Sequence, residues 1–172
     1  MIEVHYFKRR FVLKKIKFFI LLLPLISLIG CNFDVARYAN FKDSPSKTYY
    51  TNEILEKLSN KEEFSLDVFD TNLYKYYSVS SEDLNILNNF LTSLDDEAFS
   101  KEFTTKSKEK FRLIIKFSDS KYIIKIYDKE NAKLSPWDGN YSEDIINMKD
   151  VPTHYNLYDF CDYIEHKKVE QD

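Results

Sequence analysis

Two cysteines are the most reactive side chains of this 172-residue chain, and their sequence settings differ. Cys31 ends an apolar run, FFILLLPLISLIGC, that begins at Phe18 and follows six basic residues. Cys161 lies near the C-terminal end, among the apolar residues of a segment with helical periodicity. A thiolate can be alkylated, can bind a metal or can act as a nucleophile, so the surroundings of each cysteine decide which chemistry is open to it.

The segment before Cys31 has the order of a secretory leader: basic residues, a short apolar run and a small residue before the cysteine. An uncleaved membrane span fits less well, because the uncharged run 18–29 has twelve residues and a span needs about twenty. Extending the run backwards would bury Lys14, Lys15 and Lys17 at roughly 2.5–3.5 kcal/mol each near the bilayer centre. A plain secretory signal or a short anchor remains the alternative.

The tetrad Leu-Ile-Gly-Cys that ends at Cys31 resembles the lipobox of bacterial lipoproteins. This resemblance implies that the Cys31 thiol is the lipidation site, that residues 1–30 are removed as a signal peptide, and that Cys31 becomes the first residue of the mature chain. Two acyl chains are enough to hold a protein stably at a membrane. We therefore expect a lipid-anchored protein on the extracytoplasmic face of the cell membrane.

Cys161 with His154 has the composition of a thiol–imidazole pair. Cys161, however, falls on the same helical stripe as Leu157 and Ile164, where a free cysteine behaves as a small hydrophobe. His154 and His166 lie outside the short ligand spacings of zinc motifs, and the acids after residue 137 do not match a calcium loop. With two glycines in the chain, phosphate loops and nucleophile elbows are also disfavoured. We expect no catalytic residue, no metal site and no cofactor.

The segment 135–142, SPWDGNYS, is the most unusual in the mature chain, and its Trp137, Asp138 and Tyr141 are the candidate ligand-binding residues. Aromatic faces beside a carboxylate suit sugars, peptides or cationic groups. We favour the structural alternative, in which Trp137 packs over a sheet and pins a long loop. Asp138-Gly139 is expected to form a tight turn with a positive φ at the glycine.

Charge excludes some partners. Residues 31–172 carry 19 basic and 27 acidic residues, a net charge of −8, with no basic patch evident in the sequence. Nucleic acid is therefore not an expected partner, since its binding rests on neutralising phosphates. An acidic body should also stand off from anionic lipid. The expected partners are the membrane, through the N-terminal lipid, and an unidentified envelope ligand or protein.

The patterns predict three parts: a leader (1–30), a lipidated N-terminus with a flexible tether (31–47), and a single α+β domain (48–172). Alternating apolar residues and turn signals predict strands, while three- and four-residue apolar spacing predicts helices. The expected fold is an antiparallel sheet built from hairpins, with helices packed on one face. The predicted strands are 64–68, 73–79, 111–117, 122–127 and a weaker one near 132–134; the predicted helices start at Asn52, Ser80, Ser142 and Pro152, the third a single turn to Met148 and the last ending near His166.

Three further segments join the lipobox in a family resemblance: YYSVSSED at 76–83, Trp-Asp-Gly at 137–139 and YNLYDFCDYI at 155–164. With the paired strands, they are similar to a family of small uncharacterised lipoproteins from clostridia and related low-GC Gram-positive bacteria. The resemblance implies location and fold, and no site beyond Cys31.

Two functions remain open from the sequence. The favoured one is a membrane-anchored, non-enzymatic domain that binds an envelope ligand or partner; the alternative is a small cell-envelope hydrolase. A pocket with His154 or clustered carboxylates beneath Trp137 would favour the hydrolase. A filled core and a flat aromatic surface would favour the binding domain.

Overall fold

The computed structural model describes residues 44–100, 102–139 and 141–169. The leader, Cys31 and the expected tether as far as residue 43 lie outside these residues. In the described part, no helix combines the length and the apolar character that crossing a bilayer requires.

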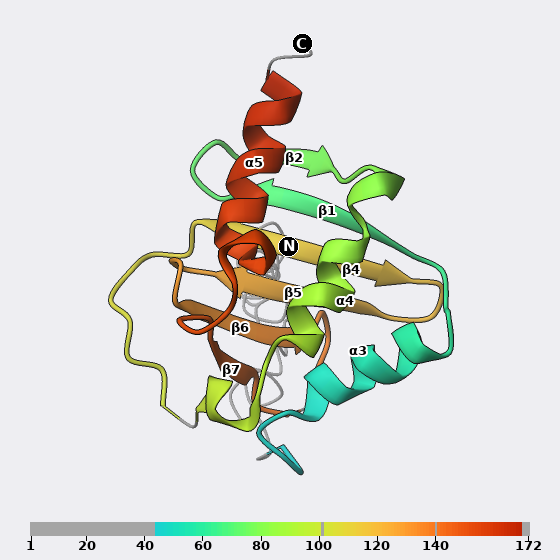
Figure 1. Ribbon diagram of the computed structural model, residues 1–172, viewed down its shortest axis with the longest axis vertical. Coiled ribbons are helices and arrows are strands. Elements are labelled where there is room, and N and C mark those ends of the chain that lie inside the picture. Colours follow the sequence, from blue (N-terminus) through green and yellow to red (C-terminus); the bar gives the residue numbers. More distant parts are fainter. Residues whose placement is uncertain (1–43, 101, 140, 170–172) are drawn as a thin grey trace, which may run out of the picture. The chain divides into compact units, whose positions relative to one another are not determined.

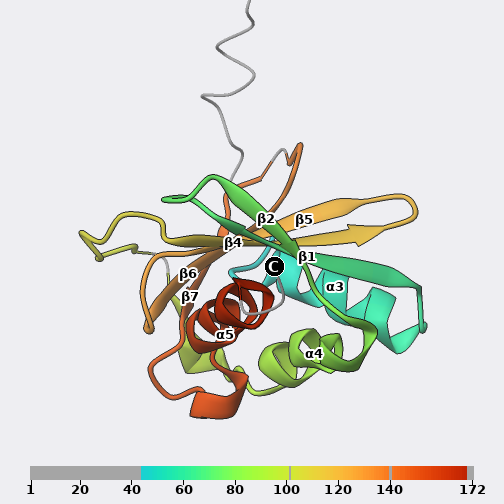
Figure 2. The same cartoon turned by 90° about the horizontal axis from the view of Figure 1, so that it is seen from above.

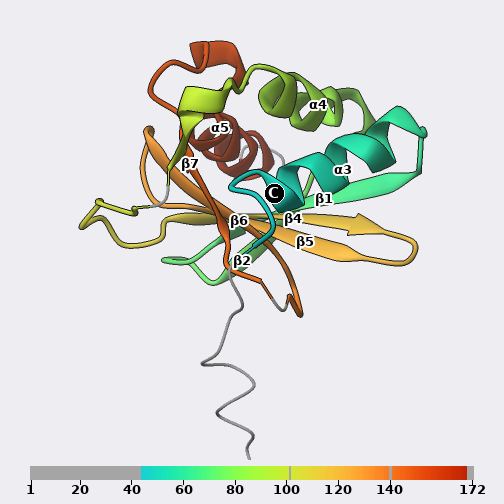
Figure 3. The ribbon, with the colours of Figure 1, turned by 90° about the horizontal axis from the view of Figure 1, so that it is seen from below.

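A seven-stranded antiparallel sheet forms one layer of the domain, in the order β2-β1-β4-β5-β6-β7-β3. Three described α-helices lie together on one of its faces, as Figures 2 and 3 show. The predicted α+β fold with helices on one face of an antiparallel sheet is therefore confirmed. The bounds are α3 (Tyr49–Ser59), β1 (Phe64–Asp70), β2 (Lys75–Ser78), α4 (Asn85–Thr92), β3 (Phe99–Ser100), β4 (Phe111–Phe117), β5 (Lys121–Ile126), β6 (Asn131–Pro136), β7 (Asp144–Asn147) and α5 (Leu157–Val169), with 3₁₀ turns at Ser81–Asp83, Asp96–Ala98 and Thr153–Tyr155.

The core lies between the sheet and the helices (Figure 1). Strands β4 and β5 supply alternate β-branched and aromatic side chains to it, which is why this pair is the centre of the sheet. Helix α5 packs against β1, β2 and β4, and α3 packs against β6 and β7. The largest side chains with less than 2% exposure include Phe90, Phe111, Leu113, Ile124 and Leu134.

Helix α3 begins at Tyr49 rather than at the predicted cap Asn52. The reason is a long-range contact: the buried Asp144 of β7 accepts hydrogen bonds from the Thr51 backbone N–H (2.7 Å) and the Thr51 hydroxyl (2.8 Å). A carboxylate from another element thus satisfies a free N–H of the first helical turn. Local sequence cannot reveal this partner, because it lies 93 residues away.

The predicted one-turn helix from Ser142 to Met148 is wrong, because these residues include strand β7. Two consecutive β-branched residues, Ile145 and Ile146, favour a strand here, and only Ile146 joins the core. Strand β7 also pairs with the two-residue strand β3, which the sequence analysis missed.

Three other boundaries shift. The last helix starts at Leu157 rather than Pro152, because Asn156 Oδ1 accepts the Tyr158 N–H (3.0 Å) as an N-cap. The residues after Ser80 first form a 3₁₀ turn, and α4 begins at Asn85. Strand β2 begins at Lys75, since Tyr74 adopts a φ of 53° and ends the preceding turn.

Candidate functional site: the open face of the sheet

Side chains that alternate with the core residues of each strand point away from the helices. We call this surface the open face, and none of the described helices covers it (Figures 2 and 3). Leu113 and Ile124 point into the core, so their neighbours Arg112 and Lys125 belong to the open face. The register places Arg112, Lys125 and Lys133 in one row across β4, β5 and β6. Adjacent strands lie about 4.8 Å apart, so the row brings three cations into a short line.

Five basic side chains lie on the open face, and three acidic side chains pair with four of them. Lys116 Nζ lies 2.6 Å from Asp67 Oδ2. Glu143 accepts from Lys125 at 2.6 Å and lies 3.4 Å from Lys133 Nζ. Arg112 pairs with Glu109. Counting these side chains, the face has a formal excess of two positive charges, whereas residues 31–172 carry a net negative charge. Its basic residues are Arg112, Lys116, Lys121, Lys125 and Lys133.

The fifth cation, Lys121, lies over an aromatic ring: its Nζ is 3.6 Å from the centroid of Trp137. Trp137 is nevertheless 60% exposed. The favoured alternative was that Trp137 packs over the sheet and pins a long loop; the ring does contact a sheet side chain, Lys121, but most of its surface stays exposed. A cation over the face of an indole ring is a favourable arrangement, worth about 0.5–1 kcal/mol at an exposed site.

Aromatic side chains continue along this surface. Phe69 of β1 lies 4.5 Å from Tyr76 of β2 between ring centroids, and Tyr76 is 64% exposed. Near the other edge, Phe103 contacts Tyr127 at 4.7 Å and carries the Lys133 amino group 4.2 Å above its ring. The open face thus combines cations with exposed or half-exposed rings.

Two apolar residues at the centre of the open face are buried. Ile114 and Ile123 are paired neighbours on β4 and β5, with exposures of 3% and 7%, yet neither belongs to the core cluster between sheet and helices. On each strand a basic residue lies two positions before and two positions after the isoleucine, on the same face of the sheet. The long alkyl stems of such residues can cover apolar surface while their charges stay in water. The centre of the open face is therefore filled.

The structure does not bring the three predicted binding residues together. Asp138 is exposed in the turn after Trp137. Tyr141 is half-buried and packs under α3 instead: its ring lies 5.1 Å from that of Tyr49, and its backbone N–H donates to the Tyr50 hydroxyl at 3.1 Å. Tyr141 thus has a packing role.

Gly139 does not have the predicted positive φ. Its role is to let the backbone of this loop approach neighbouring side chains closely. A Cβ at this position would lie 2.5 Å from Pro136 Cγ and 2.8 Å from the Tyr50 hydroxyl oxygen, and both distances are shorter than van der Waals contact allows. The glycine therefore lets the loop after β6 pass against α3.

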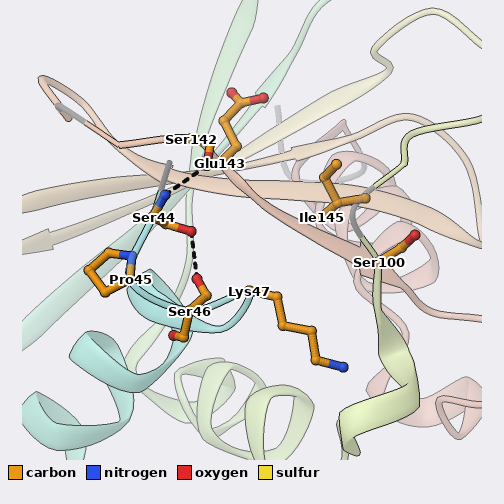
Figure 4. Close-up of a pocket in the computed structure, with 8 residues that line it drawn as sticks. All are labelled: Ser44, Pro45, Ser46, Lys47, Ser100, Ser142, Glu143 and Ile145. Carbon is orange, nitrogen blue, oxygen red and sulfur yellow. Dashed lines mark hydrogen bonds between the residues drawn. The ribbon is translucent and has the colours of Figure 1, made fainter. Parts of the chain in front are cut away.

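A cleft of about 500 Å³ lies near the open face and is bounded by the residues before α3 and by β3 and β7 (Figure 4). Its polar groups largely satisfy one another. The Ser44 N–H donates to Ser142 Oγ (3.2 Å), the Ser44 hydroxyl donates to the Ser46 carbonyl (2.5 Å), and Lys47 donates to the carbonyls of Asp96 and Phe99. These contacts hold the last residues of the expected tether against the domain. The lining residues are Ser44, Pro45, Ser46, Lys47, Ser100, Ser142, Glu143 and Ile145.

The pair considered for nucleophilic catalysis is not assembled. Cys161 is a free cysteine with no exposed surface, and burial raises the pKa of its thiol far above the ordinary value. His154 is exposed and its ring lies 4.0 Å from that of Tyr155. Among the described residues, no group of three or more His, Cys, Asp or Glu side chains is arranged to hold a metal ion.

The comparisons with known proteins agree with the predicted resemblance. A crystal structure described as "Putative Lipoprotein from Clostridium perfringens" is 31% identical to this chain, with a TM-score of 0.65. The match covers 72% of this chain and 98% of that one. A search of curated proteins found no match. A family model described as Domain of unknown function (DUF4883) matches residues 44–161. The chain therefore belongs to the DUF4883 family, which confirms the expected kinship with uncharacterised clostridial lipoproteins.

Proposed function

We propose that this protein is an extracytoplasmic lipoprotein, anchored through lipid on Cys31, whose folded domain is a non-enzymatic binding module. The leader pattern and the Leu-Ile-Gly-Cys ending support the anchor. The description of the related crystal structure as a lipoprotein supports it independently. In this proposal residues 1–30 are removed, residues 31–47 form the lipidated N-terminus and tether, and residues 48–172 form the domain; the family match starts close by, at Ser44.

The open face carries the binding part of the proposal. Its centre is filled, and it presents Trp137 and Tyr76, which are 60% and 64% exposed, beside five basic side chains. Clusters of exposed rings and cations on one face of a small domain are typical of interaction surfaces. Trp137 is the predicted binding residue that belongs to this surface; Asp138 borders it, and Tyr141 supports the loop from behind.

The binding module can be tested with the unlipidated mature chain, residues 32–172, immobilised and incubated with solubilised cell-envelope fractions. The related crystallised chain matches over 98% of its own length and covers 72% of this one, so we expect the folded domain not to need the whole sequence. We expect Trp137→Ala and Tyr76→Ala to lose the captured component.

The matched control is Tyr163→Ala, because Tyr163 is a comparably exposed ring (50%) on α5, on the opposite side of the sheet. It should capture as much as the wild type. Equal capture by all three variants would rule out the open face as the binding surface.

A further inference from the structure

We propose that the ligand of the open face is an anionic phospholipid surface, on which the domain lies with its sheet toward the headgroups. The inference rests on the proposed function, since it gives the chemistry of the ligand for the same face. It reverses the expectation from net charge alone, which was that an acidic domain stands off from such lipid.

The charge distribution supports this ligand. The open face carries five basic side chains and three acidic ones, whereas the mature chain as a whole has eight more acidic than basic residues. The remainder of the domain is therefore more acidic than the average suggests. An anionic surface attracts the open face and repels the other sides, so the charge asymmetry orients the domain as well as attracting it.

The positions of the two exposed rings favour a membrane surface, rather than a narrow ligand, as the binding partner. Trp137 follows β6, and Tyr76 lies on the edge strand β2, so the two exposed rings are separated by most of the width of the sheet. Amphipathic rings of this kind prefer the headgroup level of a bilayer. Two exposed rings, on and next to strands four places apart in the sheet order and with cations between them, match an extended anionic surface better than they match a small molecule, which needs a concave site.

The tether sets how strong the attraction must be. Twelve residues separate Cys31 from Ser44, and a segment of twelve residues cannot span more than about 45 Å in any conformation. A domain held so close to the bilayer experiences a millimolar effective concentration of the surface. A weak contact, formed by an excess of two positive charges and two rings, is then sufficient to keep the open face against the membrane.

The single tryptophan makes the test direct. Trp137 is the only tryptophan in the chain, so its emission reports on the open face alone. The unlipidated chain 32–172 is titrated to millimolar lipid, which matches the effective concentration in the anchored protein, with vesicles of phosphatidylcholine containing one-third phosphatidylglycerol and with vesicles of phosphatidylcholine alone. We expect a blue shift and co-sedimentation with the anionic vesicles only, both reduced by added salt.

The test variant is Lys116→Gln with Lys121→Gln, which removes two cations from the open face. The control is Lys129→Gln with Lys149→Gln, which removes the same charge elsewhere: Lys129 pairs with Asp159 of α5, and Lys149 lies in the turn after β7. Each cation near an anionic surface contributes roughly a fivefold factor. The test variant should therefore lose about tenfold or more in vesicle partitioning, and the control should stay within about twofold.

Three results would overturn the proposal: no blue shift with anionic vesicles, equal shifts with both kinds of vesicle, or equal losses in the test and control variants. A shift with soluble polyphosphate and none with vesicles would replace the lipid by a soluble polyanion and leave the binding module intact. Because the chain used has no Cys31, none of these outcomes depends on lipidation.

Discussion

Cys161 belongs to α5, and its side chain lies in the core together with those of Leu157 and Ile164. Helical spacing predicts this position, because three apolar residues one turn apart share a face, and the structure confirms it. Burial also accounts for the unreactive thiol that we expect, since reaction requires the thiolate and burial raises the pKa.

Substitution of Cys161 tests that role. Cys161→Ala should lower the free energy of unfolding by about 1 kcal/mol, because a small buried group is lost and a small cavity remains. Cys161→Ser should lower it further, because the hydroxyl would lack a partner among apolar neighbours. Chemical denaturation of both variants gives the two values. A serine variant as stable as the wild type, or fast labelling of the native thiol, would place Cys161 at the surface.

Asp144 is the residue whose role the sequence concealed. The sequence pattern placed it in the first turn of a short helix, yet it is 1% exposed and its Oδ1 has no hydrogen-bond partner among the described residues. Burial raises the pKa of Asp144, while hydrogen bonds from Thr51 oppose this effect in part. Only the fold, which places β7 under the start of α3, shows that this carboxyl supports a helix.

The raised pKa predicts a pH dependence. A carboxyl that binds its proton more tightly in the folded state stabilises the fold below the unfolded-state pKa, and that contribution is lost as the pH rises through the folded-state pKa. Asp144→Asn keeps an acceptor for Thr51 and removes the buried charge. The stability of the variant relative to wild type should therefore increase between pH 4 and pH 7, as measured by denaturation at both values. A relative stability that falls over this range would show that the folded-state pKa is lowered.

At the scale of elements, local sequence patterns were sufficient to predict the strands and helices whose apolar residues recur with a strong periodicity. Strands β1, β4 and β5 and helix α4 follow alternating or three- and four-residue apolar spacing, and they were predicted to within a few residues. Strand β7 was mistaken for a helix because Ser142, Glu143 and Asp144 have the composition of a helix start. Strand β3 has two residues and no pattern, and only its pairing with β7 defines it.

The loop between β6 and β7 depends on Gly139. Gly139→Ala should lower the free energy of unfolding by about 1–3 kcal/mol, because the added methyl group overlaps Pro136 and the Tyr50 hydroxyl. The neighbouring Asp138→Ala is the control, since its side chain is exposed and its substitution should cost less than about 0.5 kcal/mol. Thermal melts of the two variants provide the comparison. Equal midpoints would mean that the loop moves aside without cost.

For the whole molecule, composition predicted an acidic domain but could not predict how its charges are distributed. The basic row of Arg112, Lys125 and Lys133 comes from three strands, and it exists only because the register aligns them. In the same way, Trp137 was identified as unusual from its neighbours in sequence, whereas its contact with Lys121 comes from the adjacent strand. Sequence therefore indicated one residue of the candidate surface, and the sheet assembled the rest.

The anchor at Cys31 is the central claim, because the proposed location at the membrane depends on it. The most direct measurement is metabolic labelling of cells with a fatty-acid analogue, comparing the wild-type protein with Cys31→Ser. Cys161→Ser serves as the control, since the buried thiol should not be acylated. We predict label on the wild-type and Cys161→Ser proteins at the mass of the chain that starts at Cys31, and none on Cys31→Ser. Continued labelling of Cys31→Ser, or an unlabelled wild-type protein, would contradict the account.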